Sequence, residues 1–195
     1  GAAGAGLAAL SMLRRSAVGP ERVLALAMPS PDTLDAETSD ARALAAELGI
    51  FLEVFEVGMP SSADEAPRPA RKRTVPDSPQ ERENRYARSR AAVLGDIFVE
   101  RGYLVLATGN KSEISIGEAS HMGDLTGDFA PLKDCLKSVV YELAAYRQER
   151  GPVFPPTLLH RRSTLQRFGS APVTDYDVLD DIVRRHVELG EGLTE

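Results

Sequence analysis

Residues 23–57 carry the stretch that decides the fold, V-L-A-L-A-M-P-S-P-D-T-L-D-A-E-T-S-D-A-R-A-L-A-A-E-L-G-I-F-L-E-V-F-E-V. Its first six residues are a short, continuous apolar run, which is typical of a strand buried on both faces. The Ser-Asp pair that ends at Asp40 opens a helix, which we expect to continue through Leu48 and to stop at Gly49. Residues 51–57 are the next strand. A strand, a helix and a strand in so short a stretch predict a β–α–β unit and therefore parallel pairing.

The rest of the chain continues to alternate helix and strand. Residues 102–107, G-Y-L-V-L-A, are the clearest buried strand, and we expect 103–107 to lie parallel and adjacent to the first two strands. Apolar residues at helical spacing predict four further helices, over residues 7–18, 84–101, 131 or 132 to 150, and 175–187. This order predicts the α/β class, with a doubly wound, Rossmann-like parallel sheet that has helices on both faces.

The composition is that of one globular domain over residues 1–195. Of the 195 residues, 43% are hydrophobic and 27% are charged, which suits a single buried core. A net charge of −6 argues against a nucleic-acid partner, and no apolar run approaches the ~20 residues that a membrane span needs. The one cysteine, Cys135, excludes internal disulfides and is expected to be a small buried helical residue. The default expectation is a cytoplasmic protein.

Two segments depart from the regular alternation. The chain opens with G-A-A-G-A-G-L-A-A-L, and a glycine-rich turn that runs into a helix normally follows a strand. We therefore expect the chain to be a piece of a longer one and to lack the first strand of its sheet. Residues 58–82 hold five prolines and the basic run 71–73, a composition that does not build a core. We expect a mobile loop there.

Ligands of a doubly wound sheet bind at the carboxyl ends of its strands. Three segments fall at that edge: the glycine-rich start, residues 29–35 and residues 108–128. The last is the most suggestive, because its glycines let backbone N–H groups approach an anion. Its charged residues and two lysines that follow suit magnesium and phosphate, with Glu113, Asp124 and Asp128 as oxygen ligands and Lys111, Lys133 and Lys137 as cations. A glycine-rich surface loop with solvated charges is the alternative.

A family resemblance rests on the same segment. Residues 103–113, Y-L-V-L-A-T-G-N-K-S-E, and residues 129–134, F-A-P-L-K-D, resemble the synthetase domain of NAD synthetases, most closely the glutamine-dependent branch. E-N-R-Y-A-R-S-R at residues 83–90 is similar to that family's E-N-x-Q-A-R-x-R. Three further matches follow the same order along the chain, at residues 23–30, 40–50 and 176–182. The resemblance covers nearly the whole chain and implies a fold of the adenine nucleotide alpha hydrolase type.

The resemblance implies a ligase that joins deamido-NAD and ammonia. ATP first adenylates the nicotinate carboxylate and releases pyrophosphate, and ammonia then displaces AMP to give NAD. A carboxylate is a poor acyl donor, so a mixed anhydride has to form while Mg²⁺ and lysines neutralise the charge on the leaving pyrophosphate. In the glutamine-dependent branch a glutaminase supplies the ammonia. That activity would lie in another domain or subunit, because Cys135 has no neighbours that would make it a nucleophile.

Position within the resemblance also assigns site residues and an assembly. The residues implied for ATP are Gly4, Gly6, Thr108, Lys137 and Ser163. The residues implied for deamido-NAD are Arg88, His121 and Asp128, and Glu113 would hold Mg²⁺. Three of them have a simpler interpretation, with Glu113 as an acid at a helix N-terminus, Arg88 on a solvated helix face and His121 in a solvated loop. The family also implies a two-fold homodimer, with residues 84–101 in its interface.

One motif of the family is missing. NAD synthetases carry a pyrophosphate-binding loop, S-G-G-x-D-S, and residues 2–7, A-A-G-A-G-L, take its place when counted back from residues 19–20. A register shifted by two residues puts Gly1 inside the motif and Gly4 at the Asp position, so neither register keeps the Asp or the second Ser. Backbone N–H groups there can still cradle phosphate, but the Asp ligand and the Ser hydroxyl are absent. Three functions therefore stay open: an NAD synthetase domain, a catalytically impaired homologue that binds nucleotide or a partner subunit, and an ATP-using amide ligase for another acid.

Overall fold

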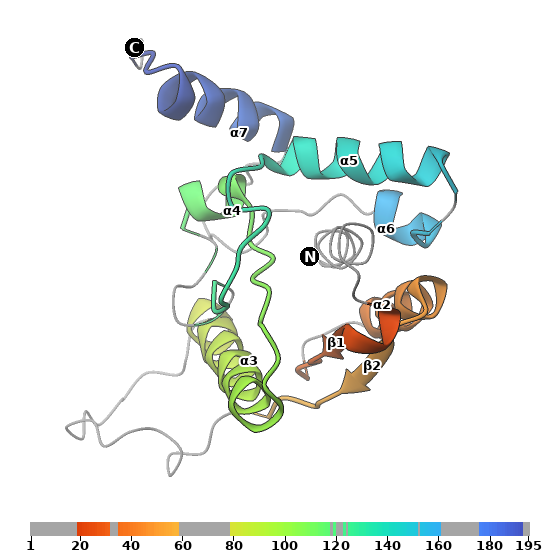
Figure 1. Ribbon diagram of the computed structural model, residues 1–195. Coiled ribbons are helices and arrows are strands. Elements are labelled where there is room, and N and C mark those ends of the chain that lie inside the picture. Colours follow the sequence, from red (N-terminus) through yellow and green to blue (C-terminus); the bar gives the residue numbers. More distant parts are fainter. Residues whose placement is uncertain are drawn as a thin grey trace, which may run out of the picture.

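The structure is a computed structural model that describes residues 19–31, 35–58, 79–117, 119, 123, 125–151, 153–160 and 176–192. The predicted helix over residues 7–18 and most of the proline-rich segment lie outside these residues. The elements are, in chain order, η1 (Pro20–Arg22), β1 (Leu24–Ala27), α2 (Asp35–Leu48), β2 (Phe51–Val54), α3 (Pro79–Arg101), α4 (Lys111–Ser115), α5 (Lys137–Glu149), α6 (Pro156–His160), α7 (Tyr176–Val183) and the π-helical turn η2 (Arg184–Glu188) (Figure 1). None of the helices in these ranges is long and apolar enough to cross a membrane.

The first two strands confirm the predicted β–α–β unit. β1 pairs with β2 in parallel, in a register that begins with Leu24 opposite Phe51. The pairing continues beyond both strands, because the N–H of Val57 donates to the carbonyl of Pro29 at 2.9 Å. α2 contacts both strands and lies beside them in Figure 1. It ends where predicted, since Gly49 follows it with a left-handed φ of 65°.

α2 begins at Asp35, so the prediction that Asp40 opens the helix is wrong. Asp40 lies inside α2, is only 7% exposed and accepts a hydrogen bond of 2.6 Å from the hydroxyl of Thr157 in α6. Aspartate favours helix starts because its side chain bonds to nearby backbone, but here a partner far along the chain takes that carboxylate. The contact attaches α6 to α2.

The prediction of a third sheet strand at residues 103–107 is wrong. The described residues form a small parallel sheet of two strands. Residues 103–107 instead meet the loop that follows, in a single parallel bridge between Leu106 and Phe129. The N–H of Ala107 donates to the Phe129 carbonyl at 2.9 Å, and the N–H of Val105 donates to the Asp128 carboxylate at 2.8 Å. The segment is apolar like a buried strand, but the backbone of Val105 and Ala107 bonds to Asp128 and Phe129 and not to a strand of the sheet.

Three helices differ from their predicted bounds. α3 begins at Pro79 rather than at residue 84, because proline is well tolerated at the first helical position, where the missing N–H would be unpaired in any case. α5 begins at Lys137 rather than near residue 131, since residues 131–135 form turns and a bend. Cys135 is therefore half-buried outside a helix, not buried within one. The α-helix α7 ends at Val183, where the winding becomes π-helical, and not at residue 187 as predicted.

Two apolar clusters form the core, and α5 belongs to both. The first cluster joins α2, α5 and α6 through Leu44, Ala144, Val153, Phe154 and Leu158. The second joins the start of α5 to α7 through Leu136, Tyr176, Leu179 and Val183. Figure 1 shows α5 running between α6 at one end and α7 at the other. α5 therefore connects the region of the small sheet to the C-terminal helix.

We predict that Gly127→Ala destabilises the protein by about 1–3 kcal/mol. A Cβ at this position would lie 2.6 Å from the backbone nitrogen of Ala107, which is held by its bond to Phe129. Gly95→Ala in α3 is the matched control, because nothing lies within 4 Å of its Cβ position and alanine favours a helix by about 0.5–1 kcal/mol. Urea unfolding measures both variants. A loss of stability at Gly95, or none at Gly127, would contradict the packing described here.

Candidate functional site

The segment 108–113, T-G-N-K-S-E, ends in a capped helix. Asn110 is the N-cap of α4, and its side-chain oxygen accepts from the N–H of Glu113 at 3.1 Å. In return, Glu113 Oε2 accepts from the N–H of Asn110, also at 3.1 Å. This is a capping box, in which two unpaired N–H groups at a helix start are satisfied by side chains. Glu113 is thus an acid at a helix N-terminus, which was its simpler interpretation. Its pairing with Asn110 was not predicted.

Lys137 and Glu113, which the sequence analysis placed in one site, form an ion pair. The ammonium Nζ of Lys137 lies 2.6 Å from Glu113 Oε1, and the two side chains are only 7% and 16% exposed. The same ammonium lies 5.3 Å from the centre of the Tyr176 ring. Burial by itself raises the pKa of the Glu113 carboxyl, but the charge and hydrogen bond of Lys137 and the N–H of Asn110 help to outweigh burial. The pKa of Glu113 therefore lies below its ordinary value.

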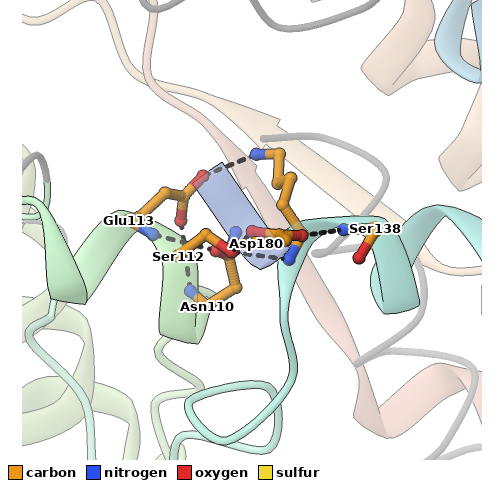
Figure 2. Close-up of polar contacts among 6 residues, drawn as sticks. Asn110, Ser112, Glu113, Ser138 and Asp180 are labelled. Carbon is orange, nitrogen blue, oxygen red and sulfur yellow. Dashed lines mark hydrogen bonds and ion pairs between the residues drawn. The ribbon is translucent and has the colours of Figure 1, made fainter. Parts of the chain in front are cut away.

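A second pair of polar side chains adjoins this ion pair. Ser112 is completely buried and bonds through its hydroxyl to the carboxylate of Asp180, which comes from α7 and is 2% exposed. The Ser112 hydroxyl also accepts from the N–H of Lys137 at 2.8 Å, and Asp180 Oδ2 accepts from the N–H of Ser138 at 2.7 Å. Figure 2 shows these groups converging from α4, α7 and the start of α5. We call the six residues Asn110, Ser112, Glu113, Lys137, Ser138 and Asp180 the polar cluster.

Ser112 and Asp180 were not among the predicted site residues. A signal for Asp180 was present, because it lies four residues after Tyr176 and three before Val183, on the face of α7 that is otherwise apolar. An acid on a buried face needs a partner. The identity of that partner is not visible in the sequence, since Ser112 lies 68 positions away.

Two further predicted residues lie among the described ones but outside the polar cluster. Arg88 is half-buried on α3, and Asp128 is exposed in the loop where it bonds to the N–H of Val105. Thr108 is half-buried, two residues before the N-cap of α4. Gly4, Gly6, His121 and Ser163 lie outside the described residues, as does Asp124.

Glu113 is the residue that the resemblance implies for Mg²⁺. No group of three or more His, Cys, Asp or Glu side chains in the described ranges is placed to hold a metal. Both carboxylate oxygens of Glu113 already have partners, one in Lys137 and the other in Asn110. Magnesium is commonly held by one or two carboxylates together with substrate phosphates, so Glu113 would join such a site only if one of these contacts opened.

A hollow lies beside the polar cluster, between α5 and α7. Its lining is mostly acidic: Ser138, Glu142, Asp177, Asp180, Asp181 and Arg184. Four carboxylates against one guanidinium would repel the phosphates of a nucleotide. The hollow is therefore a poor candidate for a phosphate site, and Lys137, whose ammonium lies beside Glu113, is the better candidate.

A parallel β–α–β unit is typical of α/β domains that bind nucleotides. Comparison with known proteins identifies the family within this class of α/β domains. A family model described as NAD synthase matches residues 3–194. The chain belongs to the NAD synthase family, as the resemblance predicted.

The curated relatives are longer than this chain. The glutamine-dependent NAD(+) synthetase of Synechocystis sp. is 34% identical over 186 residues, which are 92% of this chain and 33% of the relative. The protein of the same description from Xanthomonas campestris pv. campestris is 35% identical over 183 residues, which are 88% of this chain and 32% of the relative. The chain thus spans about a third of the length of these relatives.

Solved structures agree on the fold. The glutamine-dependent NAD+ synthetase from Acinetobacter baumannii, in complex with adenosine diphosphate, superposes with a TM-score of 0.67 at 32% identity, over 97% of this chain and 34% of that one. The NMN synthetase from Francisella tularensis superposes with a TM-score of 0.72 at 20% identity, over 100% of this chain and 75% of that one, and shows the fold alone. The fold is that of NAD synthetases, of the adenine nucleotide alpha hydrolase type.

We predict that Glu113→Gln lowers the free energy of unfolding by about 1–3 kcal/mol at pH 7, because it leaves the buried Lys137 ammonium without its counter-charge. The pKa of Glu113 is lowered in the folded protein, so its carboxylate stabilises the fold above the ordinary glutamate pKa of about 4.3. That stabilisation is lost as the pH falls through the lowered pKa. The difference between wild type and Glu113→Gln should therefore shrink from pH 6 toward about pH 3.

Urea unfolding at a series of pH values measures this difference wherever the wild type is folded. Glu47→Gln, at an exposed position of α2, is the matched control and should differ little from wild type at every pH. A wild-type advantage over Glu113→Gln that is the same at about pH 3 as at pH 7 would show that the charge of Glu113 does not stabilise the cluster.

Proposed function

We propose that this chain is the synthetase part of a glutamine-dependent NAD synthetase, whose reaction is the ATP-dependent amidation of deamido-NAD. The observation that carries the proposal is the match of the NAD synthase family to residues 3–194, which includes the T-G-N-K-S-E segment. The products would be NAD, AMP and pyrophosphate. The relatives are described as glutamine-dependent, and about two thirds of their length has no counterpart here. A glutaminase that delivers ammonia is therefore proposed as another part of the parent chain or as a separate subunit.

The proposed chemistry assigns each residue a task. Lys137 and Thr108 would contact ATP, together with Gly4, Gly6 and Ser163, while deamido-NAD would meet Arg88, His121 and Asp128. The nicotinate carboxylate attacks the α-phosphorus of ATP, and pyrophosphate leaves with the bonding electrons. A fixed ammonium near the leaving group stabilises that charge, and Lys137 is held in place by Glu113. Ammonia then attacks the carbonyl carbon of the adenylate and expels AMP.

The ion pair of Lys137 bears on how nucleotide would bind. Because Glu113 Oε1 lies 2.6 Å from the ammonium, an incoming phosphate has to share or displace that contact. ATP and Mg²⁺ are the cofactors of this proposal, and Glu113 would hold Mg²⁺ together with the phosphates of the nucleotide.

A second candidate function is supported by one specific observation. Residues 2–7 lack the Asp and the Ser of the S-G-G-x-D-S loop. A homologue without these groups would bind nucleotide or a partner subunit but would not adenylate efficiently. The two candidates differ in turnover, and the second allows ligand binding without it. Measurements of turnover and of ligand binding therefore separate them.

We predict that the chain alone makes NAD from deamido-NAD, MgATP and ammonia very slowly or not at all. Loss of one group that is preorganised for developing charge typically costs ~10²–10³ in rate. Two such groups are absent from residues 2–7, although their effects need not add because they serve one site. Pyrophosphate release with saturating ammonium measures the rate. Turnover near the ~10 s⁻¹ median of enzymes would show that the glycine-rich start suffices.

Binding is expected to survive the loss of turnover. Calorimetry should detect weak binding of deamido-NAD by the wild type, and Arg88→Ala should weaken it. Arg82→Ala is the matched control, because Arg82 is an exposed arginine of the same helix. No detectable binding by the wild type, or equal effects of the two variants, would contradict the proposed deamido-NAD site.

We also propose the two-fold dimer implied by the family, with α3 in its interface. Near the end of α3, Ile97 is buried within the chain itself, whereas Phe98 is 45% exposed and its neighbour Val99 is 78% exposed. These two side chains are the candidates for contact with a second copy. Light scattering at micromolar concentration should give the mass of a dimer, and the mass of a monomer would contradict the proposal.

A further inference from the structure

We propose that Asp180 is a positioning residue, which fixes the first turn of α5 and thereby sets where the Lys137 ammonium lies at the candidate nucleotide site. The expected effect on nucleotide affinity rests on the proposed function. The structural part of the inference rests only on contacts among described residues. Asp180 itself comes from α7 and is not one of the groups proposed to touch ATP.

The burial of Asp180 requires a specific role. Asp180 is only 2% exposed, and the burial of a carboxylate costs stability unless hydrogen bonds compensate for the lost water. Both oxygens are compensated: Oδ1 by the Ser112 hydroxyl and Oδ2 by the N–H of Ser138. An apolar residue would pack at this position of α7 at no such cost, so the hydrogen bonds are what the aspartate contributes.

These bonds take the place of a local cap on α5. The N-cap residue, Leu136, makes no side-chain hydrogen bond, so α5 supplies no acceptor for its own first N–H groups. The N–H of Lys137 is accepted by Ser112, and the N–H of Ser138 is accepted by Asp180, 42 positions away in the sequence. A negative charge also interacts favourably with the N-terminus of a helix. The cap of α5 is thus supplied by α4 and α7.

The side chain of Lys137 starts from this capped turn. Its ammonium reaches Glu113 at 2.6 Å, and Glu113 is itself fixed by the capping box of α4. The same C-terminal segment contacts α4 a second time, through an ion pair of 2.7 Å between Glu188 and Lys111. A change at Asp180 therefore loosens the backbone that carries Lys137, while Glu113 keeps its place.

Three variants of the full 195-residue chain test this role. Asp180→Ala removes both hydrogen bonds. Asp180→Asn removes the charge but keeps an oxygen for the N–H of Ser138 and an amide that donates to Ser112, so it is the rescuing variant. Val183→Ala is the matched control, because it weakens the apolar packing of α7 one turn away without touching the hydrogen bonds. Ser112→Ala replaces Asp180→Ala if the latter does not fold, since it removes the partner of Asp180 Oδ1 and the acceptor for the N–H of Lys137 in the same turn.

Two readouts are needed. The first is ATP affinity by calorimetry without deamido-NAD, and the second is hydrogen exchange of the Lys137 and Ser138 amides. Asp180→Ala should weaken ATP binding roughly tenfold and speed exchange at both amides, while Asp180→Asn should restore most of each. Val183→Ala should lower the melting temperature but leave ATP affinity and the relative exchange of these amides unchanged.

The outcomes separate this inference from the proposed function. If Asp180→Ala and Val183→Ala behave alike in both readouts, Asp180 acts only through general stability and the inference is overturned. If wild type does not bind ATP, the proposed nucleotide site fails, and amide exchange alone decides the positioning role. Selective exchange at Lys137 and Ser138 in Asp180→Ala would then support it, and unchanged exchange would overturn it.

Discussion

The N-terminus of α5 and the ammonium of Lys137 lie in the interior, where water does not satisfy them. A buried N–H without an acceptor and a buried cation without a counter-charge both cost stability, so other parts of the chain have to supply partners. Ser112 and Glu113 supply them from α4, and Asp180 supplies one from α7. Because α5 also joins both apolar clusters of the core, the arrangement of three helices depends on this one set of polar contacts.

The same contacts bear on function. A buried ion pair adds little net stability compared with an apolar core, but breaking it by removing one partner is costly. Glu113 therefore holds Lys137 in a defined place. Under the proposed function, a phosphate that replaces Glu113 would find the ammonium already oriented. The chain belongs to the NAD synthase family, and an ammonium positioned in this way suits the stabilisation of a leaving pyrophosphate.

Local sequence chemistry predicted part of this structure. The β–α–β unit was predictable because an apolar run, a helix stop at Gly49 and a second strand follow one another closely. Lys137 and Glu113 were identified from the family segment, but their pairing was not, since it joins residues 24 positions apart. Asp180 was missed for the same reason, and in the apolar segment 103–107 the backbone bonds to the loop at Asp128 and Phe129 and not to a strand of the sheet. What the sequence left open was which distant group satisfies each polar atom.

A double-mutant cycle measures whether Lys137 and Glu113 stabilise each other in the interior. Glu113→Gln, Lys137→Met and the double variant are compared with wild type in the free energy of unfolding at pH 7. We expect the stability losses of the two single variants, added together, to exceed the loss of the double variant by a coupling energy of about 1 kcal/mol or more. Effects that add to within about 0.3–0.5 kcal/mol would show that the two side chains do not depend on each other, and would contradict their mutual stabilisation.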